Sequence, residues 1–532
     1  MTSTAATDAT TIPQLVRAAA ELYGDRNAIE DGDVTLTFAA LADAALRASR
    51  GFIACGIESG DRVAIWAPNV NEWIIAAVGL QSVGAVLVPL NTRFKANEAG
   101  YILRKSRARM IFTVADFLGT RYPQLVRDAG KLPALEQVVC LRGEDEGSIT
   151  WSQFLASGDS VSADDAIARA DAVKADDLSD LLFTSGTTGN PKGVMTRHGQ
   201  NLRAFRSWTE VVGLSDQDRY LIVNPFFHAF GYKAGWLSAI MRGATIVPHQ
   251  VFDVPAVLAR IGAEGITMLP GPPALYQSIL ANPKRADFDL SSLRLAVTGA
   301  ASIPVELIKR MSNDLGFETV ITGYGLTEAC GIATMCRFDD DPETIATTSG
   351  RAIADVEVCC VDDAGTEVPR GEPGEVVVRG YNVMGGYFED DAETALTIDD
   401  KGWLHTGDIG VMNERGYLRI TDRKKDMFIV GGFNCYPAEI ENLILANEQI
   451  AQAAVIGVPD ERLGEVGMAF VVLTPGAELT AETIHQWCRD NMANYKVPRS
   501  VELVDELPMN AIGKVTKFVL RQRAADARAS GR

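Results

Sequence analysis

The sequence is poor in positive charge and has no arrangement of residues typical of a structural metal site. Its 532 residues include 69 acidic and 50 basic side chains, which gives a formal net charge of −19. Such a charge argues against nucleic acid or an anionic membrane surface as a partner, because both would repel the protein. The eight cysteines lack CxxC or zinc-ligand spacing, and only five histidines occur. We therefore expect the cysteines to be small buried residues in a reducing compartment.

Targeting signals and long apolar runs are also missing. Residues 1–11 are polar and lack the basic and apolar regions of a secretory signal peptide. The most apolar stretch, residues 73–90, is interrupted by Gln81, Ser82, Gly84 and Pro89, so it fits a buried helix followed by a core strand better than a membrane span. The sequence predicts a cytoplasmic protein without an integral membrane segment.

The chain has enough length and apolar content, 47% of its residues, for more than one hydrophobic core. Helical stretches alternate with short strand-like runs over residues 12–110, and the alternation resumes with runs at residues 220–223, 244–247, 266–269, 293–298 and 319–322. From about residue 350 short β-runs are punctuated by glycine, and residues 424–532 form a separate αβ unit. The pattern predicts an α/β fold, with a large multi-sheet N-terminal domain, a small β-rich subdomain and a smaller C-terminal α+β domain.

Residues 184–193, with the sequence TSGTTGNPKG, are the most informative stretch of the chain. Glycines let a polyanion approach the backbone, hydroxyl and N–H groups donate hydrogen bonds, and a lysine adds positive charge. A Walker P-loop requires Gly-Lys-Ser/Thr, whereas Lys192 lies between Pro191 and Gly193. The stretch therefore predicts a triphosphate-binding loop that is not a Walker P-loop.

Further short motifs follow this loop in a fixed order. They are PFFH at 225–228, TGAA at 298–301, GYGLTE at 323–328, WLHTGD at 403–408, DRKKD at 422–426, GGFN at 431–434, YPAEIE at 436–441 and PMNAIGK at 508–514. The series resembles the adenylate-forming superfamily of acyl-CoA synthetases, peptide-synthetase adenylation domains and luciferases. The resemblance implies an adenylation domain over residues 1–421, a hinge at 422–425 and a mobile C-terminal lid domain over 426–532.

The resemblance also implies a reaction in two steps on a carboxylic acid. The acid's carboxylate attacks the α-phosphate of ATP, pyrophosphate leaves, and a thiol then displaces AMP from the acyl-adenylate. Because charge builds on the phosphate, catalysis should rest on positioning and on nearby cations. ATP, Mg²⁺ and coenzyme A are the expected cofactors and co-substrate.

Most of the implied site residues contact the nucleotide. The β- and γ-phosphates would be held by Thr184, Ser185, Gly186, Thr187, Thr188, Gly189 and Lys192. Thr327 would face the α-phosphate, and Glu328 would bind Mg²⁺ because a carboxylate suits a hard cation; the alternative for Glu328 alone is a solvated surface carboxylate. The adenine and the ribose would be held by Gly299, Ala300, Ala301, Gly323, Tyr324, Gly325, Asp408 and Arg423.

The remaining implied residues belong to the lid and to the path of the thiol. Lys514 resembles the superfamily's catalytic lysine, which reaches the attacking carboxylate and the α-phosphate. Gly431, Gly432 and Phe433 would line a tunnel for the pantetheine arm of coenzyme A. His228 would be a gate between the acyl pocket and this tunnel, or else a histidine packed between aromatic side chains.

The acyl pocket is expected around Phe227, His228, Phe230, Lys233 and Tyr276. Peptide-synthetase domains carry an aspartate after the aromatic motif, whereas His228 and Ala229 follow Phe227 here, so amino acids are not expected as substrates. Residues 224–235 and 270–278 are similar to actinobacterial CoA ligases that activate the bicyclic propionate left by steroid-ring degradation. Lys233 would meet a ring ketone of that acid or act as a structural ion-pair partner; medium-chain and aryl acids are the alternative substrates.

The thiol that accepts the acyl group and the oligomeric state are less constrained by the sequence. No carrier-protein module follows the PMNAIGK motif before the chain ends at Arg532, so free coenzyme A is the expected acceptor and a separate carrier protein is the alternative. A nucleotide-binding regulator would require decayed catalytic positions, and none of the expected ones has decayed. A homodimer is left open.

Overall fold

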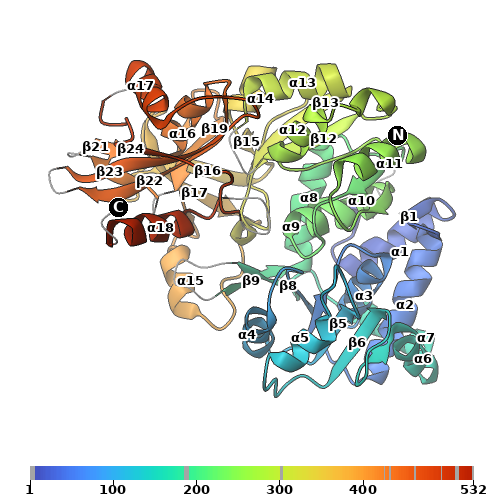
Figure 1. Cartoon of the computed structure of the whole chain (residues 1–532). Coiled ribbons are helices and arrows are strands. Elements are labelled where there is room, and N and C mark those ends of the chain that lie inside the picture. Colours follow the sequence, from blue (N-terminus) through green and yellow to red (C-terminus); the bar gives the residue numbers. More distant parts are fainter. Residues whose placement is uncertain are drawn as a thin grey trace.

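The computed structural model describes residues 6–184, 191–299, 303–423, 426–430, 433–435, 437–460, 463–492, 494–509 and 515–529. Several sheets with helices packed around them make up the N-terminal part, and a smaller set of elements follows at the C-terminal end (Figure 1). This arrangement confirms the predicted α/β fold class.

The largest sheet carries the phosphate-loop region at one edge. Its order is β7 (Ile149–Thr150), β6 (Gln137–Arg142), β5 (Met110–Val114), β3 (Arg62–Trp66), β4 (Val86–Pro89), β8 (Leu178–Thr184) and β9 (Lys192–Arg197). The strands are parallel apart from the antiparallel pair β8–β9. Strands β4 and β5 are buried along their whole length, as expected for a parallel sheet covered on both faces.

The N-terminal helices are amphipathic or fully buried, according to their place. They are α1 (Ile12–Tyr23), α2 (Phe38–Ala54), α3 (Asn71–Ser82), α4 (Ala96–Ser106), α5 (Tyr122–Asp128), α6 (Trp151–Ser157) and α7 (Ala163–Ala172). The side chains of α3 are buried except for that of Glu72, which is half-buried, and β4 follows this helix. The apolar residues 73–90 thus form a buried helix and a core strand, as predicted.

Two further groups of strands complete the N-terminal sheets. One has the order β10 (Arg219–Ile222), β11 (Thr245–Pro248), β1 (Asn27–Asp31) and β2 (Val34–Thr37), and the other β12 (Leu295–Gly299), β13 (Thr319–Tyr324), β14 (Thr334–Met335) and β15 (Arg351–Ala352). The run 266–269, predicted as a strand, forms only single bridges from Met268 to Tyr220 and to Leu295, which link the two groups. The helices here are α8 (His198–Val212), α9 (Ala229–Gly231), α10 (Ser238–Arg242), α11 (Val254–Glu264), α12 (Pro273–Ala281), α13 (Val305–Leu315) and α14 (Pro342–Thr347).

The β-rich subdomain predicted after residue 350 is an antiparallel meander. It runs through β16 (Val356–Val361), β17 (Pro373–Gly380), β18 (Leu404–Met412) and β19 (Leu418–Arg423), with α15 (Asp391–Thr397) between β17 and β18. The hairpin of β18 and β19 turns at residues 413–417, where Asn413 accepts backbone hydrogen bonds from Arg415 and Tyr417.

The C-terminal elements form an α+β unit with a hydrophobic core of its own. Its strands are β20 (Phe428–Val430), β21 (Phe433–Cys435), β22 (Ile450–Asp460), β23 (Gly464–Leu473) and β24 (Ser500–Leu503), and its helices are α16 (Pro437–Leu445), α17 (Ala481–Asn491) and α18 (Lys517–Ala529). Its buried apolar side chains cluster separately from those of the N-terminal part. The hinge at 422–425 stays a prediction, because Lys424 and Lys425 lie outside the described residues.

Two expectations drawn from composition can be compared with the structure. All eight cysteines are free and buried or half-buried, as expected. No helix in the described ranges combines the length and the apolar character needed to cross a bilayer.

Candidate active site

The hairpin of β8 and β9 holds both ends of the phosphate loop. Thr184 and Lys192 are directly paired across the two strands, so the loop between them begins and ends at neighbouring points. Five of the predicted phosphate ligands, Ser185, Gly186, Thr187, Thr188 and Gly189, lie outside the described residues. The structure thus places the two ends of the predicted site next to each other.

Glu328 lies beside the start of this loop, although the two are far apart in sequence. Thr327 and Glu328 belong to a one-turn 3₁₀ helix that follows β13. The Thr184 hydroxyl donates a hydrogen bond to Oε1 of Glu328 at 3.3 Å, and the Tyr387 hydroxyl donates to the same oxygen at 3.1 Å. The predicted phosphate and magnesium residues are therefore neighbours.

Lys192, on β9 opposite Thr184, is held by a carboxylate from another part of the chain. Its ammonium forms an ion pair with Glu393 on α15 and lies 5.1 Å from the centre of the Tyr387 ring. A hollow of about 190 Å³ opens beside Lys192 and Tyr387. The lysine charge is thus next to a space at the end of the phosphate loop.

Glu328 has the surroundings expected of a magnesium ligand that acts together with nucleotide phosphates. Mg²⁺ takes oxygen ligands, keeps several waters and is usually bound by one or two carboxylates plus substrate phosphates. In the described ranges no group of three or more His, Cys, Asp or Glu side chains could hold a metal ion by itself. The half-buried Glu328 carboxylate fits an ion that ATP brings with it, and such an ion would neutralise charge on the phosphates.

The residues predicted for adenine and ribose lie at the ends of β12, β13 and β19 and in the middle of β18. Gly299 on β12 and Gly323 on β13 are paired neighbours. The Tyr324 hydroxyl donates a 2.6 Å hydrogen bond to Oδ2 of Asp408 on β18, and Asp408 is only 6% exposed. Arg423 on β19 is the cross-strand partner of Asp408, although its side chain lies outside the described part of the chain, as do Ala300 and Ala301.

Gly325 is required by close packing of the backbone. A Cβ at this position would lie 2.2 Å from the carbonyl oxygen of Gly331, a distance that no side chain tolerates. The GYGLTE motif therefore needs glycine here to bring Thr327 and Glu328 to the end of β13.

The aromatic motif reaches the same region from β10. His228 caps the short helix α9, where its Nδ1 accepts a hydrogen bond from the Phe230 amide at 3.2 Å. Phe227, His228 and Phe230 are half-buried, so each keeps some exposed surface. These three residues can line a pocket.

Lys233 and Tyr276 have different surroundings from the rest of the predicted acyl pocket. Lys233 is completely buried, and its ammonium lies 3.1 Å from the Asp180 carboxylate and 2.9 Å from the Thr196 hydroxyl. Tyr276 is also fully buried, and its hydroxyl donates to the carbonyl oxygen of Leu269 at 2.7 Å. The structure supports the ion-pair interpretation of Lys233 and gives Tyr276 a packing role, because neither side chain has exposed surface to offer a ligand.

The predicted lid residues fall largely outside the described part of the chain. Gly431, Gly432 and Lys514 are not described, nor is the side chain of Phe433. The segments on either side of Lys514 do lie together, since Met509 and Val515 form an antiparallel bridge and the Thr516 amide donates to the Pro508 carbonyl at 2.7 Å.

Sequence reasoning missed Tyr387 and Glu393. The order Asp390-x-x-Glu393 is a helix-start signature, and Asp390 does accept the Glu393 amide at 3.2 Å. This signal predicts the helix α15. The same pattern does not predict the contact between Glu393 and Lys192, which is 201 positions away.

Comparison with known proteins agrees with this arrangement. The family described as AMP-binding enzyme matches residues 16–388, and the family described as AMP-binding enzyme C-terminal domain matches residues 439–514. A protein of Rhodococcus jostii named 3-[(3aS,4S,7aS)-7a-methyl-1,5-dioxo-octahydro-1H-inden-4-yl]propanoyl:CoA ligase is 49% identical, over 96% of this chain and 98% of its own length. The Mycobacterium tuberculosis protein of the same name is 50% identical, over 97% and 99%.

Solved structures with similar folds extend the comparison to ligand complexes. The anthranilate CoA ligase AuaEII, solved with anthranoyl-AMP, has a TM-score of 0.86 and 29% identity, and the match covers 98% of both chains. The o-succinylbenzoate CoA synthetase MenE of Bacillus subtilis, solved with its acyl-adenylate intermediate, has a TM-score of 0.81 and 28% identity, over 95% of this chain and 97% of its own. The motifs, the convergent site and these matches together show that the chain belongs to the family of AMP-binding enzymes.

Proposed function

We propose that the chain is an ATP-dependent acyl-CoA ligase for a bulky alicyclic propionate produced in steroid catabolism. The observation that carries this proposal is the identity of 49% and 50%, over at least 96% of the chain, with two ligases named for a methyl-dioxo-octahydroindenyl propanoyl group. The enzyme joins the acid to AMP, releases pyrophosphate, and then transfers the acyl group to the thiol of coenzyme A.

In this proposal the nucleotide lies across the ends of β8, β12 and β13 and beside the middle of β18. Thr184, residues 185–189 and Lys192 hold the β- and γ-phosphates. Thr327 faces the α-phosphate, and Glu328 binds the magnesium ion. Asp408 accepts hydrogen bonds from the ribose, with Arg423 alongside. The 2.6 Å hydrogen bond that the Tyr324 hydroxyl donates to the Asp408 carboxylate supports this role.

The acid occupies the side of the site formed by Phe227, His228 and Phe230. Aromatic rings supply apolar surface for a fused bicycle. The ring ketones of such an acid require donors other than Lys233, because that ammonium is bound to Asp180 and Thr196 inside the core. Gly431, Gly432 and Phe433 form the pantetheine tunnel in the second step.

A panel of acids tests the activity and the substrate together. Purified protein is incubated with ATP, Mg²⁺ and bicyclic dioxo propionates, straight medium-chain acids or aryl acids, with and without coenzyme A, and AMP release is measured. The proposal expects the highest kcat/KM for the bicyclic propionates and multiple turnovers only with coenzyme A. A higher kcat/KM for medium-chain or aryl acids would overturn the substrate, and turnover that requires a carrier protein would overturn the acceptor.

The lid assignment has a separate test in Lys514. In the proposal the lid turns at residues 422–425 and removes Lys514 from the site after adenylation. Lys514→Ala should lose adenylation by at least about a hundredfold and still form thioester from supplied acyl-adenylate. Equal loss of both steps would contradict the lid switch.

Two broader properties belong to the same proposal. The enzyme works in the cytoplasm, where ATP and coenzyme A are available, and it associates as a homodimer. Cell fractionation and light scattering of the purified protein test them; a membrane-bound or strictly monomeric protein would contradict them.

A further inference from the structure

A segment that joins the subdomain to α15 runs beside the strand that leaves the phosphate loop. The Gly385 amide donates to Met195 at 2.9 Å, the Met195 amide donates to Gly386 at 3.0 Å, and the Phe388 amide donates to Gly193 at 2.7 Å. Residues 385–388 therefore extend the sheet beyond β9, and their position is fixed relative to Lys192.

The same segment holds Glu328. The Met384 amide donates to the Glu328 carbonyl at 2.8 Å, and the Tyr387 hydroxyl donates to the Glu328 carboxylate at 3.1 Å. The Tyr387 phenol therefore donates to the carboxylate that is proposed to bind Mg²⁺.

The helix α15, into which this segment leads, holds Lys192. Glu393 forms an ion pair with the Lys192 ammonium, and its own place on α15 is fixed because Thr394 accepts the Tyr387 amide at 2.9 Å. The exposed fractions of the Lys192 and Glu393 side chains are 11% and 27%. A free lysine side chain has many rotamers, so a partner that limits them reduces the entropy lost when a phosphate binds.

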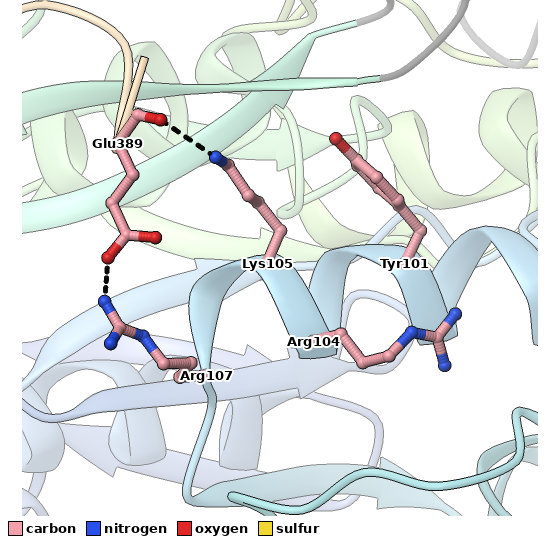
Figure 2. A pocket seen from close by; sticks show the side chains of 5 residues that line it. All are labelled: Tyr101, Arg104, Lys105, Arg107 and Glu389. Atoms are coloured by element: carbon pink, nitrogen blue, oxygen red, sulfur yellow. Dashed lines mark hydrogen bonds and ion pairs between the residues drawn. The ribbon is translucent and has the colours of Figure 1, made fainter. Parts of the chain in front are cut away.

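An outer contact joins the segment to α4. The Arg107 guanidinium pairs with the Glu389 carboxylate, and the Lys105 ammonium donates to the Glu389 carbonyl at 3.0 Å (Figure 2). Both Arg107 and Glu389 have positive φ, at 52° and 51°, which non-glycine residues rarely adopt. Glu389 lies between the two positioning contacts in sequence and touches neither Lys192 nor Glu328 in any contact described here.

We propose that Tyr387 and Glu393 are positioning residues for the adenylation step. Tyr387 orients the Glu328 carboxylate for the magnesium–phosphate group, and Glu393 holds the Lys192 ammonium at the end of the phosphate loop until the phosphates of ATP bind. The inference deepens the proposed ligase function and rests on it.

The main test removes the carboxylate at position 393. Glu393→Ala should raise KM for ATP by about tenfold, because the lysine loses its preferred orientation, and should leave KM for the acid within about twofold. Glu393→Gln keeps an oxygen that accepts from the ammonium, so it should restore KM for ATP to within about threefold of wild type. Thioester formation from supplied acyl-adenylate should be unchanged in both variants.

The second test removes only the phenol oxygen. Tyr387→Phe keeps the ring beside Lys192 and loses the hydrogen bond to Glu328, so the Mg²⁺ concentration for half-maximal adenylation should rise about fivefold. Glu389→Gln is the matched control, because it removes a charge from the same segment at an exposed ion pair and should change neither constant by more than about twofold.

Several results would overturn the inference. A lower KM for ATP in Glu393→Gln would make Glu393 a competitor of the phosphates. Equal increases in the KM for ATP and the KM for the acid would indicate a general disturbance. An effect of Glu389→Gln as large as that of Glu393→Ala would show that the position of the charge does not matter. Failure of the ligase proposal is a separate result, since wild-type protein would then release no AMP with any acid.

Discussion

Two lysine–carboxylate pairs lie at opposite ends of the β8–β9 hairpin and differ in burial. At the base, Lys233 and Asp180 are both 0% exposed, and Asp180 also accepts hydrogen bonds from Ser179 and Asn201, each at 2.7 Å. At the tip, Lys192 and Glu393 are partly exposed beside a hollow. A buried pair surrounded by donors cannot exchange partners without large cost, whereas a pair near solvent can. Burial thus separates a lysine that fixes the hairpin from a lysine that can serve a ligand.

The largest effect should come from breaking the buried pair. Lys233→Met leaves the Asp180 charge without its counter-ion in the core, so the free energy of unfolding should fall by about 3–5 kcal/mol. The double variant Asp180→Asn/Lys233→Met removes both charges and should recover much of that loss. Denaturant unfolding of the full chain, followed through the transition of its N-terminal part, measures the free energy of unfolding of both variants. Lys309→Met, at an exposed position, is the control. A loss below about 1 kcal/mol in Lys233→Met would contradict the contrast between base and tip.

The base of the hairpin should also contribute a pH dependence of stability, through His198. His198 follows β9 directly, is fully buried and accepts the Ile12 amide at 3.3 Å, and burial lowers its pKa to about 4. Below its ordinary pKa of about 6.5 the unfolded chain binds a proton that the folded protein does not. The free energy of unfolding should therefore be about 2 kcal/mol lower at pH 5 than at pH 7.5 through this group. Unfolding curves of His198→Gln should lack this part of the pH dependence; an unchanged slope would show that His198 is not its source.

At the tip the expected loss is in catalysis instead of stability. Lys192→Ala should lower kcat/KM for ATP by roughly tenfold and change the unfolding free energy by less than about 1 kcal/mol, because the ion pair that it breaks is partly exposed at Glu393. Initial-rate kinetics and thermal melts provide the two measurements. Lys105→Ala is the control, since Lys105 lines the same hollow as Lys192 and its ammonium donates to a backbone carbonyl. A strong loss of stability with unchanged kinetics would reverse the roles given to tip and base.

The smallest effect should come from the ribose side of the site. Tyr324→Phe removes the 2.6 Å hydrogen bond to Asp408 and keeps the ring. A hydrogen bond of this kind contributes about 0.5–1.5 kcal/mol, so KM for ATP should rise about threefold while KM for the acid is unchanged. A similar change in both constants would indicate a general disturbance of the pocket.

The sequence predicted elements well where local pattern and burial agree. The predicted alternation of helices and strands over residues 12–110 is confirmed by β3, α3, β4, α4 and β5, and the breaks at Gln81, Ser82 and Gly84 mark the end of α3 before β4. The run 266–269 failed as a strand because only Met268 pairs with its neighbours. Apolar character predicts burial in such a run and leaves the number of backbone partners open.

The candidate site was predictable only through its motifs. Thr184 contacts Glu328, and Tyr324 contacts Asp408, in two pairs of residues that the resemblance assigned to the nucleotide site. The role of Lys233 depended on Asp180, which lies 53 positions earlier on β8, and the role of Glu393 depended on Lys192. A single sequence reveals residue types and local periodicity, whereas long-range ion pairs are set by topology.

The most direct test of the ligase account follows the oxygen atoms of the acid. Bicyclic propionate labelled with ¹⁸O in its carboxylate is incubated with wild-type protein, ATP, Mg²⁺ and coenzyme A, and the AMP is examined by mass spectrometry. Attack of the carboxylate on the α-phosphate predicts AMP that carries one ¹⁸O atom per turnover. Unlabelled AMP, or release of ADP and phosphate, would contradict an acyl-adenylate intermediate.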